Sequence, residues 1–109
     1  MTSKHEKLID DLITKTESGD VRWGPTDAED QFVLKLKSGA ILLEKTQILF
    51  VNENFVITIL NNEGVAIDRI SLLAEPYRSK VAELFNLIDR RISRIDEQID
   101  EIIGELETL

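Results

Sequence analysis

The last third of the chain repeats apolar residues in alternating steps of three and four, and the pattern holds for about four heptads. The residues that share this spacing form two interleaved series: Phe85, Ile92, Ile99 and Leu106, and Val81, Ile88, Ile95, Ile102 and Leu109. A helix that packs only on its own sheet shows a wider stripe with a period of 3.6 residues. The strict period of 3.5 residues therefore predicts coiled-coil-like packing of one helix on another.

A single long helix is predicted over residues 76–109. Pro76 suits the first turn of a helix, where its missing N–H costs nothing, and no other helix breaker occurs before Gly104. At 1.5 Å per residue this helix would be about 50 Å long, whereas a compact domain of this size spans about 35 Å. The helix should therefore overhang the domain, and the isoleucines within residues 95–102 would face water unless something covers them.

Two elements could cover the overhanging stripe. One is a predicted helix over residues 3–18, which begins with the capping-box pair Ser3 and Glu6. Its apolar face consists of Leu8, Ile9, Leu12 and Ile13. At about 24 Å this helix covers about half of the stripe. The other element is a second copy of the chain. We therefore predict a homo-oligomer, either a dimer or a tetramer, in which the N-terminal helix packs alongside.

Charge divides the long helix into two halves. Residues 78–94 carry five bases and two acids, whereas residues 96–107 carry six acids and no base. Antiparallel pairing with a crossing near Ile95 would place each acidic half against the arginines of the other copy, whereas parallel pairing would stack acid on acid. We therefore favour antiparallel pairing. The residues predicted to form the oligomer interface are Phe85, Ile88, Ile92, Ile95, Ile99, Ile102, Leu106, Arg91 and Arg94.

Between the helices, apolar residues within residues 31–71 alternate with a period of two, which predicts β-strands. Turn residues at Ser38–Gly39, 52–54 and 61–64 join these strands by short links, so neighbouring strands must be antiparallel. The pattern therefore predicts a β-meander of about four strands.

Two short stretches leave the strand boundaries open. Residues 44–47 interrupt an apolar stretch and could form a bulge, a bend or a separate turn. Residues 21–23 could add a short strand that Gly24–Pro25 ends. The 109 residues are expected to form one α+β domain spanning 1–109, with an N-terminal helix, the meander and the long C-terminal helix.

Composition excludes several classes of protein. The chain has no cysteine and one histidine, which excludes a disulfide framework, a thiol nucleophile and a cysteine-based zinc site. Its 21 acids and 13 bases give a net charge of −8, which argues against nucleic-acid binding and allows a basic protein partner. No apolar run approaches the roughly 20 residues of a membrane span, and the polar N-terminus is no signal peptide. We expect a cytoplasmic protein that does not contact a membrane.

The residue types that carry catalysis are few, and each has a structural interpretation. His5 lies between a lysine and a glutamate on the N-terminal helix and is expected to be a solvated surface residue. The acids of residues 96–107 lack the loop signature of a calcium site and fit the solvated side of a coiled helix better. The five glycines form no phosphate-binding loop. We therefore predict that the protein is not an enzyme and has no cofactor and no catalytic or metal-binding residue.

An aromatic residue and a basic cluster each allow two interpretations. Trp23 could anchor a partner, but we favour a plug at the edge of a small core. Arg90, Arg91 and Arg94 form a basic cluster that could contact an acidic ligand or RNA. We favour a role in the assembly, because Asp96 and further acids follow the cluster directly.

The motif Thr-x-x-Gly-x-x-x-Trp, formed by Thr16, Gly19 and Trp23, follows the first helix, and Glu63–Gly64 lies at a hairpin turn. With its helix, meander and long final helix, the chain resembles small prokaryotic proteins of phage or mobile-element type. The resemblance implies this layout but no activity, since such proteins generally have none assigned. It transfers no functional residue.

These observations favour a non-enzymatic, self-associating module for protein interaction or regulation. An alternative is an acidic inhibitor or immunity-type protein that meets a basic partner through charge. A third hypothesis is a metal-dependent enzyme that uses carboxylates alone, for which the sequence offers the least support.

Overall fold

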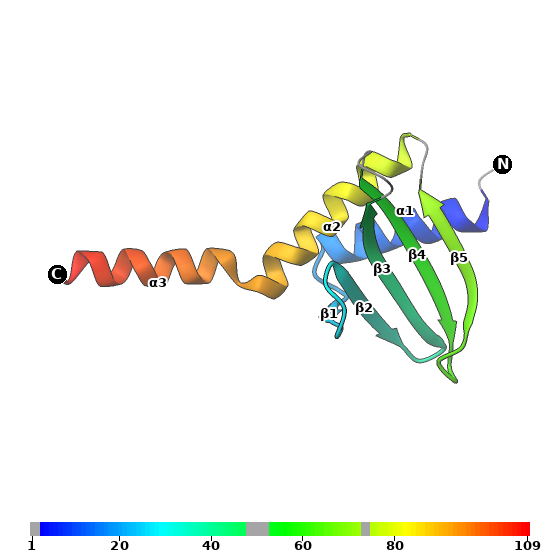
Figure 1. Cartoon of the computed structure of the whole chain (residues 1–109), viewed down its shortest axis with the longest axis horizontal. Coiled ribbons are helices and arrows are strands. Elements are labelled where there is room, and N and C mark those ends of the chain that lie inside the picture. The colour runs from blue at the N-terminus through cyan, green and yellow to red at the C-terminus, as the bar shows by residue number, and fades with distance from the viewer. Residues whose placement is uncertain (1–2, 48–52, 73–74) are drawn as a thin grey trace.

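In the computed structural model, which describes residues 3–47, 53–72 and 75–109, one helix precedes an antiparallel sheet and two helices follow it (Figure 1). The elements are α1 (Lys4–Glu17), β1 (Gly24–Pro25), β2 (Gln31–Leu36), β3 (Gly39–Gln47), β4 (Glu53–Asn61), β5 (Ala66–Leu72), α2 (Tyr77–Ser93) and α3 (Ile95–Glu107). The strands lie in the order in which they follow in sequence, and each pairs antiparallel with the next. The predicted α+β fold with a β-meander is confirmed.

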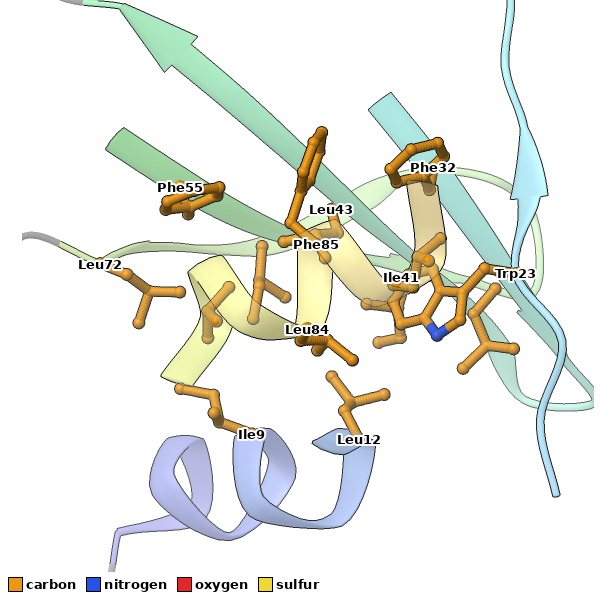
Figure 2. Packing of buried hydrophobic residues seen from close by; sticks show 14 residues of the cluster. Ile9, Leu12, Trp23, Phe32, Ile41, Leu43, Phe55, Leu72, Leu84 and Phe85 are labelled. Carbon is orange, nitrogen blue, oxygen red and sulfur yellow. The ribbon is translucent and has the colours of Figure 1, made fainter. Parts of the chain in front are cut away.

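Two helices cover one face of the sheet and the third leaves it. α2 packs directly on β3, β4 and β5, and α1 packs against α2, with Ile9 and Leu12 directed at Leu84 (Figure 2). α3 extends away from this body, so the molecule measures 57 × 36 × 29 Å (Figure 1). Its radius of gyration of 16.1 Å exceeds the roughly 13 Å of a compact chain of this length. The predicted overhang is therefore present, and α3 forms it.

Phe85 of α2 lies at the centre of the core. Its ring centroid lies 4.9 Å from that of Phe32 and 5.7 Å from that of Phe55, both on the sheet (Figure 2). Strand pairing places Phe32 beside Leu43, and Leu43 beside Ile57, so one face of three strands presents a continuous apolar row. The alternation that predicts the strands therefore also identifies the face on which α2 packs.

The N-terminal helix forms as predicted. The Ser3 hydroxyl accepts a hydrogen bond from the backbone N–H of Glu6 at 3.1 Å, which satisfies one of the free donors of the first turn. Gly19 follows the helix with φ +82°, a conformation that glycine adopts without a steric penalty. Ile9 and Leu12 are buried, so this helix covers part of the apolar stripe of α2.

Residues 44–47 do not interrupt their strand, contrary to the prediction. β3 continues through them to Gln47 in unbroken register with β4. Glu44 lies 3.4 Å from the guanidinium of Arg69 on β5, and the Lys45 ammonium lies 5.2 Å from the centroid of the Phe85 ring. Because both charged side chains have partners from other elements, the strand continues through polar sequence.

The sheet has one short strand more than predicted. Gly24–Pro25, which we expect to end a strand at residues 21–23, itself pairs with Val33 and Phe32 of β2. β1 is an edge strand, the position within a sheet at which proline is tolerated. The edge position therefore explains why a proline can be part of this strand.

The predicted single helix over residues 76–109 is wrong in one respect, because it is divided at Arg94. This residue has φ 52° and ψ 37°, the left-handed conformation, and it ends α2 and precedes α3. The left-handed conformation costs a residue other than glycine roughly 1–2 kcal/mol. Arginine is a good helix former, so no residue type in the sequence predicts this break. The change of direction frees α3 from the body of the protein.

Gly39→Ala is expected to lower the free energy of unfolding by about 1–3 kcal/mol. Gly39 has φ +157° at the start of β3, and a Cβ there would collide with the carbonyl oxygen of Leu60. Urea denaturation followed by tryptophan fluorescence measures the loss. Gly24→Ala is the control, because its Cβ would lie 4.0 Å from the carbonyl oxygen of Val33, at ordinary contact distance. Equal losses in the two variants would contradict this explanation.

Candidate interaction surface

The structure divides the predicted interface residues between the core and the surface. Phe85 and Ile88 are only 2% and 1% exposed and pack against the sheet, so in this structure they contact their own chain. Ile92 is partly buried beside that core. The side chain of Ile95 lies outside the described part of the structure. The apolar pattern therefore covers two environments, and its fully exposed residues, among those whose side chains the structure describes, lie in and just after α3.

The apolar residues of α3 form the most exposed hydrophobic surface on a helix in the described part of the chain. We define the arm face as four residues of α3 and Leu109, which follows the end of the helix; the residues are Ile99, Ile102, Ile103, Leu106 and Leu109, exposed by 48%, 49%, 47%, 63% and 98%. Three of them were predicted as interface residues, namely Ile99, Ile102 and Leu106. Ile103 was missed because the heptad rule selects only two of every seven positions, although its place next to Ile102 could have revealed it.

Four of the six acids within residues 96–107 lie away from the arm face. Glu97, Asp100, Glu101 and Glu107 occupy the heptad positions that point outward when the arm face forms the seam. All four side chains are exposed. α3 is thus an amphipathic helix with one apolar face and one acidic face, and most of its length has no helix or strand of the described part of the chain beside it (Figure 1).

A cleft of about 660 Å³ opens at the base of α3. We call it the Trp23 cleft. The loop after α1 lines it with Val21, Arg22 and Trp23, and the segment from the end of α2 to the beginning of α3 lines it with Arg91, Ile92, Arg94 and Glu97. Three arginines and one glutamate therefore line a concave surface on a protein whose net charge is −8. The cleft combines an apolar floor with a positive charge.

Thr16 holds the wall of this cleft together. Its hydroxyl donates to the carbonyl oxygen of Leu12 at 2.6 Å and accepts from the indole N–H of Trp23 at 3.0 Å. Its own carbonyl oxygen accepts from Arg91 Nη1 at 2.6 Å. With Gly19 in the left-handed conformation, these contacts give the motif Thr-x-x-Gly-x-x-x-Trp a structural role. Trp23 is buried in the core, so its interpretation as a plug is confirmed (Figure 2).

Thr16→Val is expected to lower the free energy of unfolding by about 1–3 kcal/mol. Valine keeps the shape of threonine, but it leaves the buried indole N–H of Trp23 without an acceptor. Thermal or urea denaturation measures the loss. Thr16→Ser keeps the hydroxyl and serves as the control, with a smaller effect. A Thr16→Val variant as stable as the wild type would show that the hydroxyl makes no net contribution.

His5 has a contact that sequence reasoning did not predict. Its Nε2 lies 2.7 Å from Oδ2 of Asp68 on β5, which ties the start of α1 to the last strand. This hydrogen bond and the one from the backbone N–H of Arg69 lower the pKa of Asp68. On the neighbouring helix, burial raises the pKa of Tyr77, and the carboxylates of Asp10 and Glu6 raise it further. These groups are dispersed along the edge of the α1 layer and do not converge on a cavity.

The described residues contain no cluster of three or more histidine, cysteine, aspartate or glutamate side chains that could hold a metal ion. No helix in the same part of the chain is long and apolar enough to cross a membrane. Comparisons with protein-family models, with curated proteins and with solved structures found no match to this chain.

Proposed function

We propose that the protein is a non-enzymatic interaction module that self-associates by pairing the arm face with that of a second copy. The observation that carries this proposal is the exposure of four apolar residues on a helix that projects from the body, and of Leu109 just after that helix. Burying an isoleucine or leucine side chain gains roughly 1.5–3 kcal/mol. A helix as short as α3, with 13 residues, is marginally stable by itself in water, so a partner would stabilise both its fold and its position.

A second copy suits the arm face because the heptad pattern is self-complementary in the antiparallel direction. With Ile99 of one copy opposite Ile102 of the other, the two-fold axis passes between these positions and repeats the contact. The outward positions then carry most of the acids, so the two acidic faces point away from the seam. This register is centred further along the chain than the crossing near Ile95 that the sequence suggests, because the preceding turns of the stripe are buried. It sets the two acidic segments beside each other, so it rests on the apolar seam and not on the pairing of acids with arginines.

The mass of the full chain in solution tests this proposal. Light scattering or sedimentation equilibrium at micromolar concentration should give an integer multiple of 12.4 kDa, with dissociation on dilution. Helical circular dichroism should decrease with that dissociation, because free α3 frays. A particle of 12.4 kDa across the whole concentration range would refute self-association.

The acidic face of α3 favours a second candidate function, that of an inhibitor or immunity-type protein with a basic partner. Six acids and no base within residues 96–107 give this helix a strong negative field that would attract a basic surface. A monomeric protein that binds a basic protein with strong salt dependence would support this candidate over self-association.

A further inference from the structure

We propose that the Trp23 cleft receives the last two turns of α3 from a second copy, so that each subunit inserts its α3, which we call the arm, into the cleft of the other. This inference rests on the self-association proposed above. The pairing of arm faces alone leaves the Trp23 cleft uncovered, and this inference assigns a partner segment to that cleft. The contacts would be reciprocal, because each copy offers one cleft and one arm.

The side chains that line the cleft would bind a segment that is both acidic and apolar. Val21, Ile92 and the 9% exposed Trp23 offer apolar contact. Three arginines outnumber the single acid: Arg94 Nε lies 3.8 Å from Glu97 Oε2, and Arg22 and Arg91 are in excess. Arg91 is held in place by its hydrogen bond to the carbonyl oxygen of Thr16, so its charge is fixed at the cleft. An occupant must therefore supply carboxylates and aliphatic side chains together.

The end of α3 supplies this combination. Glu105 and Glu107 flank Leu106 at the end of the helix, and Leu109 lies two residues beyond Glu107. All four side chains are exposed, and the two leucines have the highest exposures of the arm face. The acids offer partners to the arginines of the cleft, and the leucines offer apolar surface to its floor.

The position of the cleft selects a second copy as the source of this segment. Glu97 lines the cleft at the beginning of α3, and ten residues of straight helix carry Glu107 about 15 Å further from it. The end of α3 therefore cannot reach the cleft of its own chain. In the antiparallel register, the end of one arm lies beside the beginning of the other, and Glu107 of the second copy lies at the same level along the helix axis as Arg94.

Exchange of charge between cleft and arm tests the proposal. The cleft variant is Arg22→Glu with Arg94→Glu, and the arm variant is Glu105→Lys with Glu107→Lys. Each variant alone places like charges at both contacts, so its self-association should weaken by roughly tenfold or more. An equimolar mixture should recover a tight 1:1 complex, because each cleft then meets an arm of opposite charge. Sedimentation equilibrium measures all three samples at the same ionic strength.

The control is Lys35→Glu with Lys37→Glu, which changes the net charge as the cleft variant does but lies at exposed positions of β2 and of the turn after it. Its association should match that of the wild type. Cleft and arm variants that associate as tightly as the wild type, or a mixture that recovers nothing, would overturn the cleft assignment and leave self-association standing. A monomeric wild-type protein would refute self-association itself, so the two failures are distinguishable.

Discussion

Phe85→Ala is expected to lower the free energy of unfolding by about 3–5 kcal/mol, a large part of the stability of a small domain. The Phe85 side chain is 2% exposed and fills the space between α2 and the sheet. Its ring contacts those of Phe32 and Phe55 in tilted geometry, and the Lys45 ammonium lies over it. Alanine would remove these contacts together and leave a cavity at the centre of the core.

Urea denaturation at a fixed protein concentration measures this effect. Asn86→Ala is the matched control, because Asn86 is the next residue of the same helix and is exposed; it should change the free energy of unfolding by less than about 0.5 kcal/mol. The comparison also separates the two environments that the heptad pattern combines. If Phe85→Ala weakened self-association but preserved the stability of the subunit, Phe85 would belong to an interface and our placement in the core would be wrong.

The heptad pattern predicted a helix and its overhang, but it could not show where the body of the protein ends. A buried position in the core of one chain and a position in a seam between two chains both require an aliphatic or aromatic side chain. Ile88 and Ile102 occupy equivalent heptad positions, yet they are 1% and 49% exposed. The difference depends on the break at Arg94, which is a backbone conformation of an ordinary helix-forming residue.

The strands could be predicted where apolar residues recur with a period of two, and less well where charged residues interrupt this alternation. Residues 44–47 look like an interruption because Glu44 and Lys45 are charged, but their partners, Arg69 and Phe85, come from elements distant in sequence. The strand propensity of a residue does not take account of contacts with elements that are distant in sequence. The Trp23 cleft is a similar case, since Arg91 meets the carbonyl oxygen of Thr16 across 75 positions of the chain. The sequence signals Thr16, Trp23 and the arginines separately, and only the fold brings them together.

Ile102→Asp is expected to weaken self-association by roughly 100-fold or more while the subunit remains folded. In a symmetric pair the substitution removes two buried isoleucines, each contributing roughly 1.5–3 kcal/mol, and places two carboxylates in an apolar seam. Ile102 is 49% exposed and lies on α3, away from the core, so the subunit loses little when it changes. Sedimentation equilibrium measures the dissociation constant, and urea denaturation verifies that the core is intact.

Gly104→Asp is the matched control for Ile102→Asp, because it adds the same side chain to the same helix at an outward position. A Cβ at Gly104 meets no atom within 4 Å. The control should therefore retain the wild-type association, even though it makes the acidic face more negative. If both variants dissociated equally, charge on α3 and not its apolar face would govern assembly. If neither did, the second copy would bind elsewhere, because a carboxylate at the centre of an apolar seam cannot be accommodated without cost.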